Sequence, residues 1–205
     1  MKKRTMIKQV AVFMALILFV FLLAGCSKGI DAMAKLSDWD DLRGKTVSEV
    51  GKALEEDPVL EGPIWEFPER VYLEGQEFIL TISFDEEEKM LGVRYRIGFQ
   101  GDDYVEKAVQ VMDTLEEAII SEFGEVWTYP GIEAYSRQED PVAAFANGGG
   151  FRDDWVVDTE EHLWASLSIS VSKEDEIAII LVSYGVNEYL TIPSDPKWSE
   201  EYASN

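Results

Sequence analysis

The sequence predicts a two-layer α+β domain in which helices pack on an antiparallel sheet. Two long hairpins are expected over residues 78–99 and 165–186. Apolar and polar residues alternate with a period of two over 78–99 and 165–171, and the nearly continuous apolar run of 177–186 predicts a central strand. An apolar stripe at helical spacing follows the first hairpin, over 103–123. With 46% hydrophobic and 12% aromatic residues among 205, the chain can bury a sizeable core and is not disordered.

The remaining elements follow from local signals. Residues Thr46 to Glu49 form a capping-box pattern, which predicts a helix over 47–56. The prolines and glycine of 59–70 predict a loop or an irregular edge strand around Trp65. Further strands are expected at 71–73, at 127–135 (broken by Pro130-Gly131) and at 151–157, with a flexible loop over 138–150.

The periodicities also predict which side chains face the core. On the long helix the apolar stripe includes Leu115, whereas Glu116 belongs to the polar face and is expected to be exposed. In the hairpins the inward positions are expected to be Phe78, Leu80, Ile82, Phe84, Leu91, Val93, Tyr95, Ile97, Phe99, Ala165, Leu167, Ile169 and Val171. Arg94, Arg96 and Trp164 alternate with these residues and are expected on the outward faces.

The two hairpins resemble each other at an offset of 87 residues. Leu80 corresponds to Leu167 and Ile82 to Ile169, and both hairpins follow a helix. Two interpretations remain open. The domain consists of two related helix-plus-meander halves, 46–100 and 101–190, or two unrelated amphipathic hairpins share the same period.

The N-terminal segment has the layout of an export signal. Four cations precede an apolar run from Val10 to Ala24, about 15 residues long and too short for a comfortable membrane span of roughly 20. The run ends in Leu23-Ala24-Gly25-Cys26, which resembles the lipobox of bacterial lipoproteins. This resemblance implies diacylglyceryl transfer to the Cys26 sulfur and cleavage between Gly25 and Cys26. The alternative is an uncleaved transmembrane helix with an incidental cysteine.

The lipobox resemblance implies that residues 1–25 are the signal peptide and that Cys26 is lipidated. Composition and periodicity predict a tether up to residue 45, the α+β domain over 46–190 and a frayed tail over 191–205. The protein would be anchored by lipid to the cell membrane or the outer membrane, facing away from the cytoplasm. The order of elements in the domain loosely resembles that of BamE-type assembly lipoproteins and β-lactamase inhibitor proteins, which favours a role in binding a protein.

Charge and residue usage exclude several classes of function. The formal net charge of −22 disfavours nucleic acid as a partner, because phosphate binding depends on basic patches. One cysteine and one histidine exclude a Cys/His zinc site. The acidic runs lack the spacing of a calcium loop and are expected to be solvated turns, so no metal or cofactor is predicted.

The sequence therefore favours a binding module of the cell envelope without enzymatic activity. No catalytic constellation is visible, and an envelope protein is the expected partner. The candidate contact residues are Trp164, as an apolar anchor, and Arg94 and Arg96, which would set the orientation of the partner. The alternative is a carbohydrate-binding or hydrolytic domain that uses paired carboxylates, such as Asp153 and Asp154, beside tryptophans.

Overall fold

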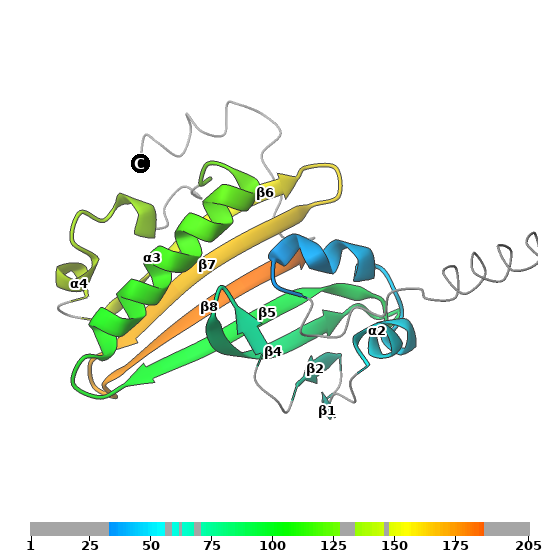
Figure 1. Ribbon diagram of the computed structural model, residues 1–205, viewed down its shortest axis with the longest axis horizontal. Coiled ribbons are helices and arrows are strands. Elements are labelled where there is room, and N and C mark those ends of the chain that lie inside the picture. Colours follow the sequence, from blue (N-terminus) through cyan, green and yellow to red (C-terminus); the bar gives the residue numbers. More distant parts are fainter. Residues whose placement is uncertain are drawn as a thin grey trace, which may run out of the picture.

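The computed structural model of the protein describes residues 33–55, 59–61, 63–67, 71–127, 134–145 and 148–186. These residues form an α+β fold built on an antiparallel sheet, as the sequence predicted (Figure 1). The elements are η2 (Leu36–Leu42), α2 (Val47–Leu54), β1 (Val59–Glu61), β2 (Ile64–Glu66), β3 (Val71–Leu73), β4 (Gln76–Phe84), β5 (Met90–Gln100), α3 (Tyr104–Phe123), η3 (Tyr135–Arg137), α4 (Pro141–Ala144), β6 (Gly149–Asp158), β7 (Leu163–Ser172) and β8 (Ile177–Val186).

The sheet has the strand order β1-β2-β4-β5-β8-β7-β6, and β3 pairs with β4 beside this path. The two predicted hairpins form as β4–β5 and β7–β8. They meet where β5 pairs with β8, so β8 is a central strand, as its nearly continuous apolar run indicated. The segment around Trp65 forms the short edge strands β1 and β2.

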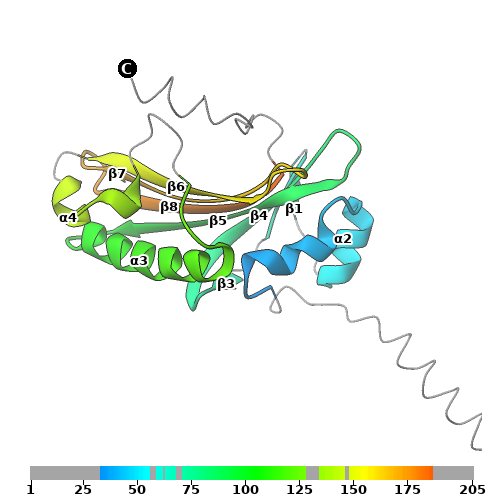
Figure 2. The ribbon, with the colours of Figure 1, turned by 90° about the horizontal axis from the view of Figure 1, so that it is seen from above.

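The helices α2, α3 and η2 lie on the same side of the sheet (Figure 2). Helix α3 runs along β5, β7 and β8 and buries Leu115 and Met112 completely against them. Helix α2 begins at the predicted capping box, in which the Glu49 carboxylate accepts a hydrogen bond from the Thr46 backbone N–H at 2.9 Å. The side of the sheet away from these helices, called here the open face, carries the outward residues of β4, β5, β7 and β8.

Residues 33–45 belong to the packed domain, which corrects the expectation of a tether up to residue 45. The 3₁₀-helix η2 buries Leu36 and Trp39 in the main core, and the Trp39 side chain is 0% exposed. Its indole N–H donates a hydrogen bond of 2.7 Å to the Tyr95 hydroxyl on β5. The residues next to Trp39 in the sequence do not predict its burial. Its pocket forms only when η2 packs on the folded sheet.

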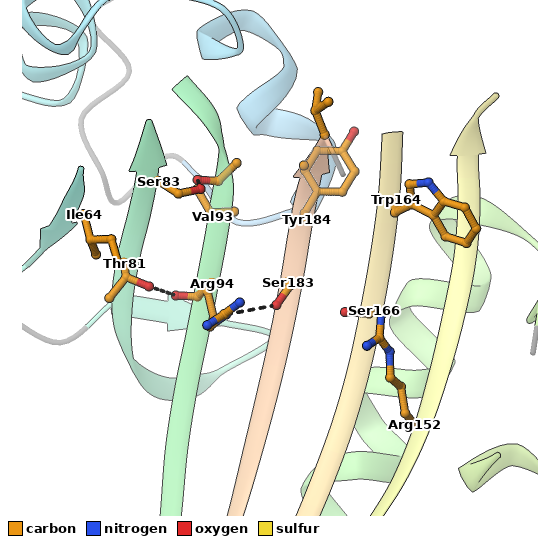
Figure 3. Close-up of a pocket in the computed structure, with 13 residues that line it drawn as sticks. Ile64, Thr81, Ser83, Val93, Arg94, Arg152, Trp164, Ser166, Ser183 and Tyr184 are labelled. Atoms are coloured by element: carbon orange, nitrogen blue, oxygen red, sulfur yellow. Dashed lines mark hydrogen bonds between the residues drawn. The ribbon is translucent and has the colours of Figure 1, made fainter. Parts of the chain in front are cut away.

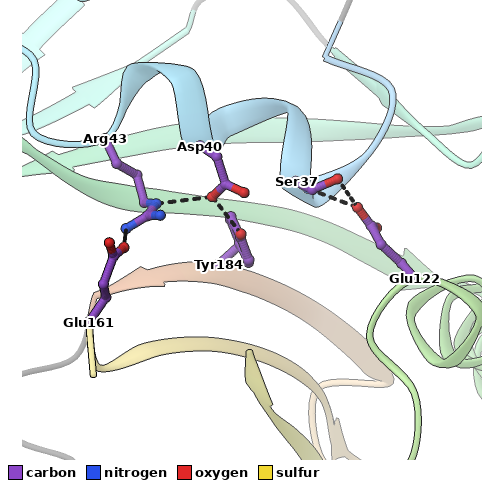
Figure 4. Close-up of polar contacts among 6 residues, drawn as sticks. All are labelled: Ser37, Asp40, Arg43, Glu122, Glu161 and Tyr184. Carbon is purple, nitrogen blue, oxygen red and sulfur yellow. Dashed lines mark hydrogen bonds and ion pairs between the residues drawn. The ribbon is translucent and has the colours of Figure 1, made fainter. Parts of the chain in front are cut away.

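Polar contacts attach η2 to three other parts of the domain (Figure 4). The Tyr184 hydroxyl on β8 donates to Asp40 at 2.6 Å, and Arg43 bridges Asp40 and Glu161 at 3.0 and 2.9 Å. The Ser37 backbone N–H donates to Glu122 of α3 at 2.9 Å. Burial, followed by the bond to Asp40, raises the pKa of Tyr184 above its ordinary value.

Three further expectations are corrected by the structure. A bulge opposite Phe84 makes Met90, rather than Leu91, the buried residue at the start of β5. In the expected strand 127–135, Trp127 forms an isolated bridge to β6 and Tyr135 begins the 3₁₀-helix η3; residues 128–133 lie outside the described chain. The expected loop 138–150 contains the helix α4, capped by Asp140, and the first residues of β6.

The register of the two hairpins agrees at the offset of 87 residues. Leu80 pairs with Tyr95, and their counterparts Leu167 and Val182 also pair. The same offset relates two residue pairs between β5 and β8. Gly92 corresponds to Ile179 and Gly185 corresponds to Gly98, and both Gly92–Gly185 and Gly98–Ile179 are paired. The agreement does not extend to the helices, since α2 has 8 residues and α3 has 20.

Within the part of the chain that the structure describes, no helix is long and apolar enough to cross a membrane. The predicted signal peptide, Gly25, Cys26 and the tail 191–205 all lie outside the described residues.

Candidate functional site

The open face brings two of the predicted contact residues together. Arg94 and Arg96 alternate along β5 with the buried Val93 and Tyr95, and both arginine side chains are exposed. Among the described residues, neither guanidinium forms an ion pair with a carboxylate. Because no described carboxylate pairs with them, these arginines can bind a ligand, and the rest of this protein is strongly acidic.

A pocket of about 210 Å³ lies on the open face beside Arg94 (Figure 3). Its wall includes side chains from β4, β5, β6, β7 and β8, and Ile64 from β2. Two arginines and four serine or threonine residues line it, namely Arg94, Arg152, Thr81, Ser83, Ser166 and Ser183. Tyr184 also lines the pocket, but its hydroxyl binds Asp40 of η2. The described lining residues include no aspartate or glutamate, so the pocket presents hydrogen-bond donors and positive charge.

Two glycines form the floor of this pocket. Gly92 on β5 and Gly185 on β8 are paired, and they separate Ser83 from Trp164 across the sheet. A Cβ atom on Gly92 would lie 2.3 Å from the Tyr184 carbonyl oxygen, so a larger residue could not occupy this position without moving the strands. The absent side chains leave space between the walls.

Arg152 reaches the pocket from β6. Its Nε and Nη2 atoms contact one oxygen of Asp154 at 2.8 and 2.7 Å, which fixes the guanidinium beside Ser166. Burial raises the pKa of Asp154, although the bond from Arg152 opposes this shift. Sequence reasoning did not single out Arg152, but its alternation with the buried Phe151 and Asp153 placed it on the open face.

Trp164 faces the pocket but is not an exposed anchor. It lies between Leu163 and Ala165, which face the core, so its direction is the predicted one. The side chain is nevertheless only 4% exposed, which corrects the expectation of an exposed residue. The Trp127 ring packs on it edge to face, with ring centroids 5.3 Å apart. Its buried indole N–H has no hydrogen-bond partner in the described structure.

A second pocket, of about 360 Å³, lies on the same face around Arg96. Ile79, Ile177 and Ile179 form much of its wall, together with Gly98. Arg96 therefore stands beside an apolar surface, whereas Arg94 stands beside hydroxyl groups. The open face offers two neighbouring depressions of different chemistry.

The neighbouring carboxylates Asp153 and Asp154 do not face each other. Asp153 is fully buried on the helix side of β6 and accepts hydrogen bonds from the Ser136 backbone N–H and hydroxyl, both at 3.0 Å. Asp154 points to the open face and binds Arg152. Because successive residues of a strand point to opposite sides, these two cannot act as a facing catalytic pair.

Glu116 is half-buried on α3, which corrects the expectation of a fully exposed residue. Burial, followed by repulsion from Asp153, Asp113 and Glu117, raises its pKa from 4.5 to about 7. Among the described residues, no group of three or more metal-binding side chains could hold a metal ion at this cluster or elsewhere.

The raised pKa of Glu116 predicts a pH dependence of stability. An acid with a raised pKa in the folded state loses stability as the pH rises from its unfolded value through its folded one, here from 4.5 to about 7. Glu116→Gln should remove this loss, so the variant should become more stable than the wild type above pH 7. Urea unfolding between pH 4 and 8 measures the difference, with the exposed Glu174→Gln, in the turn between β7 and β8, as control. Parallel pH profiles for wild type and Glu116→Gln would contradict the prediction.

Comparisons with known proteins find no counterpart for this chain. No protein-family model, curated protein or solved structure matches it.

Proposed function

We propose that the protein is a lipid-anchored, extracytoplasmic bacterial lipoprotein that binds a partner in the cell envelope and has no enzymatic activity. The lipobox-like Leu23-Ala24-Gly25-Cys26 supports the anchor and the location at the cell membrane or the outer membrane. The observation that carries the binding role is the open sheet face, on which Arg94 and Arg96 have no acidic partner among the described residues.

The arrangement of the domain supports this role. We infer two layers, in which the helices cover one face of the sheet and the other face is left for a ligand. The depressions around Arg94 and Arg96 lie on adjacent parts of this second face. A partner that carries negative charge would complement these arginines and would be repelled by the rest of the acidic surface.

The offset of 87 residues supports two related halves. Four residues of the first pocket correspond, at this offset, to residues that line the second. The corresponding pairs are Gly92 and Ile179, Ser166 and Ile79, Ser183 and Arg96, and Gly185 and Gly98. We therefore infer that the two depressions are equivalent positions of a repeated hairpin. Their different side chains would let them contact different parts of one partner.

The anchor can be tested at Cys26. Cys26→Ala should leave an unprocessed precursor, because the thiol that accepts the diacylglyceryl group is missing. Intact-mass measurement of the membrane fraction should show the acyl mass on the wild type and none on the variant. An unmodified Cys26 in the mature wild-type protein would show that the lipobox assignment is wrong.

The binding role can be tested by photo-crosslinking in the producing cell. A photo-reactive residue at Ser168, between Arg96 and Arg152 on the open face, should give a discrete adduct with another envelope protein. The same residue at Glu117, on the exposed side of α3, is the matched control. The double variant Arg94→Gln/Arg96→Gln should weaken the Ser168 adduct at least fivefold.

Replacing an exposed cation elsewhere, as in Lys52→Gln on α2, should leave the Ser168 adduct unchanged. The absence of an adduct at Ser168, or equal adducts at Ser168 and Glu117, would contradict binding through the open face.

A further inference from the structure

Resting on the proposed binding role, we propose that the pocket between Arg94 and Arg152 binds a monocarboxylate that carries a short apolar group. The carboxylate lies between the two guanidinium groups, near the hydroxyls of Ser166 and Ser183. The apolar group lies over the glycine floor towards Trp164. Figure 3 shows Arg94 and Arg152 directed towards the middle of the pocket from opposite sides.

The charge balance favours a single negative charge. Arg152 is already paired with Asp154, whereas Arg94 has only a weak contact of 3.4 Å, from its Nε to the Ser183 hydroxyl. Together these three groups carry a net charge of about +1. A carboxylate would neutralise that charge, and a guanidinium presents paired N–H donors that match the two carboxylate oxygens. A dianionic phosphate would leave one negative charge in excess.

The other end of the pocket is apolar. Ile64, Trp164 and Val186 line it, and Gly92 and Gly185 contribute backbone without side chains. An apolar group there would be removed from water on several sides.

The volume limits the size of the ligand. About 210 Å³ corresponds to roughly seven water molecules at about 30 Å³ each. A carboxylate with five or six carbon atoms fills this space. A larger molecule would have to extend along the open face. A free carboxylic acid and the C-terminal residue of a peptide offer the same chemistry.

The test is a titration of the full chain in a neutral detergent with 4-methylpentanoate, followed by ¹H–¹⁵N NMR. The resonances of the Arg94 and Arg152 Nε–H groups and of the Trp164 indole N–H should shift with one saturating dependence. The uncharged isostere 4-methylpentanamide should bind at least tenfold more weakly. Inorganic phosphate should also bind more weakly than the carboxylate.

Two variants provide the matched comparison on one strand. Arg94→Gln should weaken the binding of 4-methylpentanoate at least tenfold, whereas Arg96→Gln, on the same face but outside this pocket, should change it less than twofold. Equal binding of the acid and the amide, tighter binding of phosphate, or an equal loss in both variants would overturn the proposal.

The source of the carboxylate is distinguished by a peptide arm. A tripeptide that ends in leucine should bind as well as the free acid if the natural ligand is a chain terminus, and its C-terminal amide should not bind. Binding of the free acid alone identifies a small carboxylic acid. An adduct at Ser168 without carboxylate binding would overturn this inference and leave the proposed binding role intact. Carboxylate binding without an adduct at Ser168 would overturn the binding role and leave the proposed carboxylate site intact.

Discussion

Trp39→Ala should lower the free energy of unfolding by about 3–5 kcal/mol, as expected for a large aromatic residue removed from a core. The side chain is completely buried between η2 and the sheet, and its indole N–H donates a hydrogen bond to the Tyr95 hydroxyl. Denaturant unfolding of the full chain measures the loss. If residues up to 45 were a tether, the substitution would stay within about 0.5 kcal/mol. The exposed Lys45→Ala is the nearby control.

A double-mutant cycle separates packing from hydrogen bonding at this site. Trp39→Phe should lower the free energy of unfolding less than Trp39→Ala does. It still leaves the buried Tyr95 hydroxyl without its donor, which costs about 1–3 kcal/mol. Adding Tyr95→Phe removes the second partner and should recover part of that cost. Additive losses in the cycle would contradict a contribution from this hydrogen bond.

Trp164→Ala should also destabilise the fold, by about 3 kcal/mol or more. The reason is its burial at 4% exposure against the Trp127 ring. An exposed tryptophan on the outward face, as the sequence predicted, could instead be removed at little cost to stability. Unfolding in urea measures the change, and Arg96→Gln on the same face should stay within about 0.5 kcal/mol.

Trp164→Phe distinguishes the role of the ring from that of the N–H group. It keeps most of the apolar contact with Trp127 and removes a donor that has no partner in the described structure. Stability should therefore fall much less than in Trp164→Ala. An equal loss in the two variants would mean that the indole N–H is engaged in the folded protein.

Local and periodic features were predictable from the sequence alone. The capping box at Thr46 and Glu49 sets the start of α2, because both hydrogen bonds join groups three residues apart. The alternation in the hairpins determined which side of each strand is buried, since a strand has a side-chain period of two. These are properties of neighbouring residues and need no distant contact.

The candidate site was predictable in direction but not in composition. Alternation placed Arg94, Arg96 and Trp164 on the outward face, where the structure also has them. It could not show that Arg152, 58 positions after Arg94 in the chain, completes the same pocket. Strand order decides that, because β6 is brought near β5 only through β8 and β7.

By itself the sequence determined the α+β class, the two hairpins with their buried faces, and the long helix with its apolar stripe. The tertiary structure alone decided that Trp39 is core, that Trp127 covers Trp164, and that Gly92 and Gly185 meet to form a pocket floor. The physical reason is the range of the interactions. Periodicity and capping depend on residues a few positions apart, whereas burial and pocket shape depend on which distant segments the sheet brings into contact.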